Sequence, residues 1–247
     1  MHIEHAWVGE GTPTIVFLHE GLGSVAMWRD FPASLCAGLG MRGLVYSRPG
    51  YGKSTPRRPD ERWPPDYLHR QAYEVLPGLL DRLGVVDPVW FYGHSDGGSI
   101  ALLFASRFPQ RTAGAIVAAP HWFVEDVAIE GIARTRAGYE GGLRERLARF
   151  HDDVDSAFFG WHDAWMAPAF RGWNIARELE AIRSPVLAIQ GLDDEYGTLE
   201  QVRGIARHVK GAQVLEIARC GHSPHRDQPQ AVIGASVEFV RAQRLQP

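Results

Sequence analysis

A serine flanked by glycines is the residue best suited to nucleophilic chemistry in this chain. Ser95 lies in Gly93-His94-Ser95-Asp96-Gly97-Gly98, after the apolar run Val89-Trp90-Phe91-Tyr92 and before a helix-prone segment. In a strand-turn-helix setting such a serine occupies a tight turn, and its neighbours must be small because strand and helix backbones approach closely. The helix N-terminus adds unpaired N–H groups and a partial positive charge beside the hydroxyl. The pattern predicts a serine nucleophile.

A serine hydroxyl reacts readily only when a base removes its proton and an acid orients that base. Two later loops supply such residues: Asp194 follows an apolar run that ends at Ile189, and His222 follows the run from Gln213 to Ile217. The order serine, acid, histidine is typical of a nucleophile in a strand-turn-helix motif. Because each residue follows a different predicted strand at its C-terminal end, we expect the three to converge at one edge of a sheet.

Two neighbouring residues compete for these roles. Asp193 directly precedes Asp194, and His225 lies in the same loop region as His222. His225 is the weaker rival because it stands where the next helix is expected to begin. The residues alone leave both alternatives open.

Six short apolar runs predict the strands that must position these residues, namely 14–18, 43–46, 89–92, 114–118, 185–189 and 213–217. The first five are apolar nearly throughout, which is typical of parallel strands covered by helices on both faces. The last run alternates, as expected of a more exposed strand near an edge. Apolar residues at helical spacing predict helices over 66–83, 99–108 and 230–245. This alternation favours an α/β fold with a mainly parallel, doubly wound sheet.

One long segment interrupts the alternation. Residues 121–180 lie between two predicted strands and are longer than a crossover needs. We expect them to form a helical cap over a core built from residues 1–120 and 181–247, with Leu143 to Phe150 as one helix-prone stretch. An aromatic lining would favour an apolar or aromatic acyl substrate, although the same side chains would also serve as the core of the cap. The candidates for contact with a substrate are His121, Trp122, Trp161, Trp165 and Trp173.

These motifs together resemble the α/β-hydrolase superfamily, from the first strand to the C-terminal helix. The segment Leu18 to Ser24 is similar to the oxyanion loop, Arg48 to Ser54 to the glycine-rich loop that follows, and Gly93 to Gly97 to the nucleophile elbow. The family pattern G-x-x-D implies that Asp194, rather than Asp193, is the acid.

The oxyanion loop departs from the family pattern. Glu20 follows His19, where family members usually have glycine. The resemblance implies an oxyanion hole built from the backbone N–H of Gly21 or Leu22 together with that of Asp96. Each such donor is typically worth about 3 kcal/mol of transition-state stabilisation.

Other unusual residues leave alternatives open. Ser47 replaces the usual aspartate before the second glycine-rich loop, which we expect to alter how that loop is anchored. The Ser-Asp-Gly-Gly motif is similar to that of aminoacyl-ester hydrolases, which implies contact between Asp96 and a substrate ammonium. A carboxylate is also simply favoured at a helix N-terminus. Glu20 has three candidate partners, which are Arg48, Arg29 and the active site itself.

The resemblance implies acyl transfer to water without a cofactor. Ser95 attacks an ester-like carbonyl while His222 removes its proton, and Asp194 stays ionised to orient the imidazole. Small carboxylic esters are the first expectation. Thioesters, lactones and carbon–carbon bonds in ring-fission products of aromatic catabolism follow, because the same machinery serves all of them. The alternative from another class is a ligand-binding, receptor-like protein with negligible turnover.

The composition favours a globular protein without a nucleic-acid or membrane partner. Of the 247 residues, 45% are hydrophobic and 22% charged, and the formal net charge is -3 with no block of like charges. No stretch approaches the roughly 20 apolar residues that a spanning helix requires. The first residues show no signal-peptide pattern, and Cys36 and Cys220 do not make a disulfide framework, so we expect a cytoplasmic protein with reduced thiols.

One cluster of polar residues contains the residue types that commonly bind metal ions. His151, Asp152, Asp153 and Asp155 lie close together in the chain. Such a group is more often a solvated helix start, and serine hydrolysis needs no metal, so we expect none. The oligomeric state does not follow from the sequence.

Overall fold

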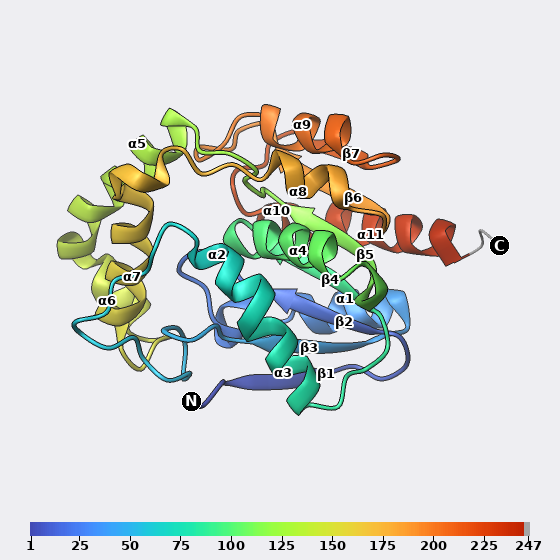
Figure 1. Cartoon of the computed structure of the whole chain (residues 1–247), viewed down its shortest axis with the longest axis horizontal. Coiled ribbons are helices and arrows are strands. Elements are labelled where there is room, and N and C mark those ends of the chain that lie inside the picture. Colours follow the sequence, from blue (N-terminus) through green and yellow to red (C-terminus); the bar gives the residue numbers. More distant parts are fainter. Residues whose placement is uncertain (245–247) are drawn as a thin grey trace.

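A seven-stranded sheet forms the centre of the computed structural model, which describes residues 1–244 (Figure 1). The strand order is β1-β3-β2-β4-β5-β6-β7, and only β1 is antiparallel to its neighbour. This confirms the predicted mainly parallel α/β sheet. The strands are β1 (His5–Val8), β2 (Thr14–Leu18), β3 (Arg42–Tyr46), β4 (Val89–His94), β5 (Thr112–Ala118), β6 (Val186–Gly191) and β7 (Gln213–Ile217).

All six predicted strands are present, and the alternating run forms β7 at one edge of the sheet. The sequence reasoning missed β1, because its four residues are exposed or half-buried and make no continuous apolar run. This strand extends the opposite edge by pairing with β3. The predicted exposure of β7 is also confirmed, since only Ile217 among its residues is buried.

Helices cover both faces of the sheet, which explains why the strands between its two edges are mainly apolar. In β4, Phe91 contributes to the core on one face, whereas Trp90 and Tyr92 contribute to the other. One face is covered by α2 (Tyr67–Arg70), η2 (Gln71–Val75), α3 (Leu76–Arg82), α4 (Asp96–Arg107), α8 (Ala176–Ala181) and α9 (Glu200–His208). The other face is covered by α1 (Phe31–Leu39) and α11 (Pro229–Arg244).

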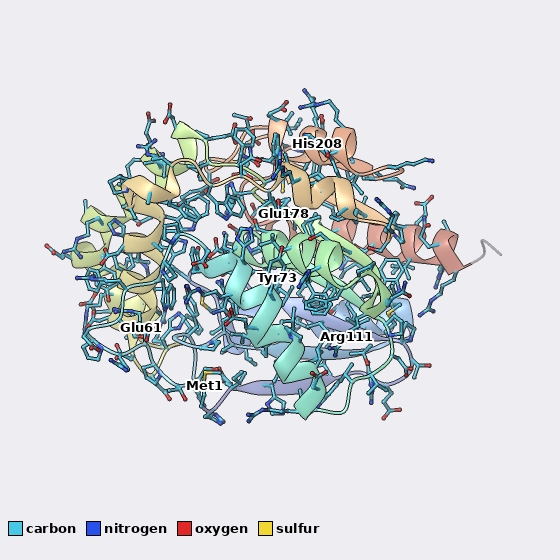
Figure 2. The ribbon with its side chains drawn as sticks, viewed as in Figure 1. Met1, Glu61, Tyr73, Arg111, Glu178 and His208 are labelled. Atoms are coloured by element: carbon cyan, nitrogen blue, oxygen red, sulfur yellow. The ribbon has the colours of Figure 1, made fainter. Side chains whose placement is uncertain are left out.

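The predicted helices match these elements with small changes at their ends. The segment 66–83 is one helical stretch that contains the π-helical turn η2. Helix α4 begins at Asp96, earlier than predicted, and it lies between α8, which carries Glu178, and η2, which carries Tyr73 (Figure 2). Leu245, the last residue of the predicted C-terminal helix, lies outside the described residues.

A group of helices is inserted between β5 and β6 and lies to one side of the sheet, at the left of Figure 1. Helix α8 follows them and packs against α4 and α9. The inserted helices are α5 (Asp126–Gly138), the π-helical η4 (Tyr139–Leu143), α6 (Arg144–Leu147), α7 (Val154–Met166) and η5 (Pro168–Phe170). Three short helices elsewhere complete the fold, namely η1 (Val25–Trp28), η3 (Pro109–Arg111) and α10 (Pro224–Asp227).

The turn between β4 and α4 holds Ser95 in a strained conformation. Its φ is 52° and its ψ is -118°, a region that non-glycine residues rarely adopt. A Cβ atom at Gly97 would overlap the backbone carbonyl of Leu18, and one at Gly93 would overlap the carbonyl of Gly97. The expected close approach of strand and helix around the serine is therefore confirmed.

No helix within residues 1–244 is long and apolar enough to cross a membrane. Cys36 and Cys220 are both buried and form no disulfide with each other.

The turn yields a prediction about stability. We expect Gly97→Ala to lower the free energy of unfolding by about 2–3 kcal/mol, because the new methyl group meets rigid backbone. Gly78→Ala is the matched control: Gly78 lies inside α3 with nothing within 4 Å of an added Cβ. This control should raise the free energy of unfolding by about 0.5–1 kcal/mol. Urea denaturation measures both, and equal stability of the two variants would contradict the close approach.

Candidate active site

The structure brings Ser95, His222 and Asp194 into one hydrogen-bonded chain. His222 Nε2 lies 3.0 Å from Ser95 Oγ, and His222 Nδ1 lies 2.8 Å from Asp194 Oδ1. Asp194 also accepts a hydrogen bond of 2.9 Å from the backbone N–H of Tyr196, which orients its carboxylate. With Nδ1–H donating to Asp194, Nε2 carries the lone pair that accepts the serine proton. These three residues follow β4, β7 and β6, whose C-terminal ends meet at one edge of the sheet.

The two rival residues lie elsewhere. Asp193 is exposed, and its backbone N–H donates to the carbonyl of Cys220. His225 lies in α10, and its ring packs against Trp28 and Phe31 with centroid separations of 4.9 and 5.3 Å. The geometry therefore favours Asp194 and His222 as the partners of the serine.

Burial and charge act in opposite directions on the two titratable partners. Burial lowers the pKa of His222, but the charge of Asp194 and its hydrogen bond outweigh burial and raise that pKa above its ordinary value. Burial likewise raises the pKa of Asp194, and the imidazole of His222 outweighs burial and lowers it. Asp194 is therefore ionised at neutral pH.

Hydrogen bonds fix the orientation of one peptide group in the loop after β2. The carbonyl of Glu20 accepts hydrogen bonds of 2.7 Å from both His19 Nδ1 and Arg48 Nη2. In a planar trans peptide the next N–H points the opposite way, so the N–H of Gly21 faces away from Arg48, on the cavity side. Within residues 1–244, the backbone N–H groups of Gly21, Leu22 and Asp96 donate to no other group. Their hydrogen-bonding capacity is available to a bound molecule.

The carboxylate of Asp96 makes hydrogen bonds and an ion pair with other side chains of the protein. Its carboxylate accepts hydrogen bonds from Tyr67 Oη at 2.8 Å and Trp165 Nε1 at 3.2 Å. Arg48 Nη1 lies 3.4 Å from the same carboxylate, and both side chains are 1% exposed. The charge of Asp96 is thus compensated by Arg48, which favours a structural role over recognition of a substrate ammonium.

Hydrogen bonds of Ser47 and Glu4 anchor the second glycine-rich loop. Ser47 Oγ donates to Glu4 Oε2 at 2.6 Å and accepts from the N–H of Val25 at 2.9 Å. Glu4 also accepts from the N–H of Lys53, so a carboxylate from the start of the chain anchors the second glycine-rich loop. In this chain, Ser47 and Glu4 together anchor the loop.

The residues between His151 and Asp155, whose types could bind a metal, make separate contacts with other parts of the chain. Asp153 caps α7 by accepting from the N–H of Ser156 at 2.8 Å, and Asp155 pairs with Arg144. His151 accepts from the N–H of Gly52 at 2.9 Å. Within residues 1–244, no three His, Cys, Asp or Glu side chains form a group able to hold a metal ion.

A cavity of about 220 Å³ adjoins Ser95 and His222, and we call it the catalytic cavity. Three of the expected substrate-contacting residues line it, namely His121, Trp161 and Trp165. Trp161 also packs directly on Gly21, where a Cβ atom would overlap its indole ring. Glu20 reaches the cavity too, and its carboxylate lies 3.5 Å from His94 Nδ1, while Arg48 contacts only its backbone carbonyl.

Trp122 and Trp173 do not line the catalytic cavity. The indole N–H of Trp122 donates to the carbonyl of Glu200, and its ring packs against α9. Trp173 stacks on Phe170 with a centroid separation of 5.5 Å. Their expected role in substrate contact is not supported, because Trp122 packs on α9 and Trp173 packs on Phe170.

Sequence reasoning missed several residues of the cavity. Ala128, Ile132 and Thr135 lie on one face of α5 and form a wall. Their i, i+4, i+7 spacing was a usable signal, but nothing in it shows which surface the face covers. Tyr196 also lines the cavity, and its ring lies 4.9 Å from that of His222.

The charge balance around His222 gives a testable titration. We expect Asp194→Asn to lower the pKa of His222 below its wild-type value, because burial remains while the compensating charge is lost. Asp193→Asn is the matched control and should leave this titration essentially unchanged, since Asp193 is exposed and outside the hydrogen-bonded chain. NMR titration of the imidazole signals measures both. A larger shift in the Asp193 variant would reverse the assignment of the acid.

Comparison with known proteins identifies the family of the chain. The family model described as "Alpha/beta hydrolase family" matches residues 15–235. A 2-hydroxy-6-oxo-6-phenylhexa-2,4-dienoate hydrolase of Burkholderia cepacia is 24% identical over 268 residues, covering 97% of this chain and 91% of the relative. A poly(3-hydroxyalkanoate) depolymerase of Ectopseudomonas oleovorans is 27% identical over 260 residues, covering 94% and 86%.

Solved structures share the same fold. The enol-lactonase from Burkholderia xenovorans LB400 superposes with a TM-score of 0.74 at 22% identity, covering 97% of this chain and 96% of that one. At this identity the likeness concerns the fold alone. Because the family model spans most of the chain, this protein belongs to the alpha/beta hydrolase family.

Proposed function

We propose that this hydrolase cleaves small carboxylic esters through an acyl-enzyme formed on Ser95. The observation that carries the proposal is the continuous chain from Ser95 Oγ through His222 to Asp194, with hydrogen-bond distances of 3.0 and 2.8 Å. In this mechanism His222 takes the serine proton during attack and then returns it to the leaving group. Water resolves the acyl-enzyme with His222 again as the base.

The backbone donors beside Ser95 support the same chemistry. The N–H of Gly21 faces away from Arg48, and the N–H of Asp96 stands at the first residue of α4. These two groups are our candidates for the oxyanion hole, and Gly21 is favoured over Leu22 because its peptide orientation is set by the bonds to the Glu20 carbonyl. Donors that are aligned in advance stabilise the tetrahedral oxyanion without reorganisation.

The inserted helices are proposed as a cap that shapes the acyl site. Walls from α5 and α7, including Ile132, Trp161 and Trp165, make the catalytic cavity small and mostly apolar. Burial lowers the pKa of His121 to about 3, so a neutral imidazole, whose Nδ1 has no hydrogen-bond partner within residues 1–244, also faces this space. A short apolar or aryl acyl group with one polar atom fits these walls.

Relatives support ester hydrolysis and one alternative. The depolymerase of Ectopseudomonas oleovorans is named for a polyester. The Burkholderia cepacia relative is named for a 6-oxo-dienoate, a compound with a ketone and a carboxylate but no ester, whose hydrolysis breaks a carbon–carbon bond. Cleavage of such a ketone by the same triad is therefore our second candidate function.

The nucleophile can be tested with p-nitrophenyl esters of graded acyl length. We expect Ser95→Ala to lower kcat at least about 10,000-fold, because no other group can form the acyl-enzyme. Ser106→Ala, at the far end of α4, is the control and should retain full activity. Full activity of the Ser95 variant would overturn the assignment. A wild type that a fluorophosphonate labels at Ser95 but that turns over no ester would favour the ligand-binding alternative.

The size of the acyl site can be tested at Trp161. Because Trp161 lines the catalytic cavity, Trp161→Phe should shift the preferred acyl chain to a longer one, with a relative gain of roughly tenfold for the longer ester. Trp173→Phe makes the same change outside the cavity and should leave the preference unchanged. The ratio of kcat/KM values for successive esters is the measurement. An identical shift in both variants would mean that Trp161 does not bound the acyl site.

A further inference from the structure

A larger space, here called the outer cavity, opens beside the catalytic cavity. It has a volume of about 600 Å³, compared with about 220 Å³ for the catalytic cavity. Glu20, Leu143 and Ser223 line both spaces, so the two cavities meet along these residues. The outer cavity is thus the neighbouring space into which a molecule bound at Ser95 would extend if it passed these three side chains.

The outer cavity is lined by four arginines and by two carboxylates, those of Glu20 and Asp30, so positive charge predominates. Its four arginines come from three segments of the chain, namely Arg29, the pair Arg146 and Arg149, and Arg226. Within residues 1–244, Arg29, Arg146 and Arg149 form no ion pair with a carboxylate, in contrast to Arg144, which pairs with Asp155. Arg29 also has a φ of 51°, a conformation that non-glycine residues seldom adopt and that the surrounding structure must impose. Unpaired guanidinium groups in a concave surface are suited to bind carboxylate or phosphate oxygens.

The junction carries the opposite charge. Burial raises the pKa of Glu20, but His94, with His19 and His225 nearby, lowers it well below its ordinary value, so the carboxyl is ionised at neutral pH. This carboxylate repels an anion on the catalytic side, whereas the arginines attract one on the outer side. The field along the two cavities therefore orients a substrate with its anionic end outward.

The position of His222 indicates which part of a substrate extends outward. Ser223 directly follows His222 and lines both cavities. In the proposed reaction His222 Nε2 gives its proton to the leaving group, so the leaving group lies on the His222 side of Ser95. That side adjoins the outer cavity, whose walls at Trp28, Phe31 and Phe150 provide apolar surface for a carbon skeleton.

We propose that the outer cavity binds an anionic group, a carboxylate or a phosphate, on the leaving-group side of the substrate. The preferred substrates are then esters whose alcohol component carries an acidic group. This inference rests on the ester hydrolysis proposed above and specifies its substrate class.

The test compares 4-carboxyphenyl butyrate with its neutral twin, 4-(methoxycarbonyl)phenyl butyrate. We expect the double variant Arg146→Gln/Arg149→Gln to lower the ratio of kcat/KM for the anionic ester over the neutral one by roughly tenfold relative to wild type. Taking the ratio between proteins cancels the different intrinsic reactivities of the two esters. In the wild type, added NaCl should lower kcat/KM for the anionic ester selectively, because salt screens the arginines. Butyrate esters with a phosphate in place of the carboxylate show which oxyanion is preferred.

The control variant removes the same charge from a distant place. Arg241→Gln/Arg244→Gln alters the C-terminal end of α11, whereas the outer cavity is lined by the other end of this helix at Pro229, Gln230 and Ile233. At 1.5 Å per residue the two sets of residues lie about 12 Å or more apart along the helix. This control should leave the ratio unchanged. Equal losses in both double variants would reduce the effect to net charge and overturn the proposed site.

Failure of the substrate class is distinguishable from failure of the function. If the wild type hydrolyses both esters and the Arg146/Arg149 variant leaves their ratio unchanged for both oxyanions, the anion site is wrong while ester hydrolysis stands. If neither ester is turned over, ester hydrolysis fails. Binding of 4-hydroxybenzoate, measured by calorimetry on the wild type and the Arg146/Arg149 variant, then decides the anion site: tighter binding to the wild type supports it, and equal or absent binding overturns it.

Discussion

The buried guanidinium of Arg48 is the interaction on which the arrangement of the site depends. It donates to the Glu20 carbonyl at 2.7 Å, approaches the Asp96 carboxylate at 3.4 Å and lies 4.7 Å over the ring of Tyr51. One side chain thus connects the loop after β2 to the first turn of α4. Removing one partner of such a buried ion pair typically costs about 3–5 kcal/mol, because the other charge remains without compensation. The orientation of the peptide between Glu20 and Gly21 follows from this connection.

Burial is the main determinant of the protonation of the histidines around the site. Burial lowers the pKa of His19, His121 and His225, so these rings are neutral at physiological pH. His222 is the exception, because Asp194 more than offsets burial and raises its pKa. Desolvation leaves the neighbouring rings uncharged. For His222, which contacts Ser95, the Asp194 carboxylate therefore decides whether the pKa is raised or lowered. A base with an elevated pKa is a stronger acceptor for the serine proton.

Local sequence patterns were sufficient for the strands, for the turn around Ser95 and for the convergence of three residues on one sheet edge. Continuous apolar runs identify buried parallel strands because such strands are covered on both faces. Gly93 and Gly97 identify the turn because any side chain there meets backbone. These features depend on residues close together in the chain or on the parallel direction of the strands. Both can be inferred from the order of the residues. The short strand β1 lacked such a pattern because it is half-exposed.

The sequence by itself determined the fold class, the serine, and the two loops that supply its partners, since each loop follows a predicted parallel strand. It left Asp193 beside Asp194 and His225 beside His222, and the geometry of the site favours Asp194 and His222. The tertiary structure alone decided which aromatic residues line the catalytic cavity, that Asp96 pairs with Arg48, and that unpaired arginines from distant segments share an outer cavity. The physical reason is that helix packing and side-chain direction arise from contacts between residues far apart in the chain. A periodic apolar face predicts that a helix packs, but it does not specify the surface that the helix covers.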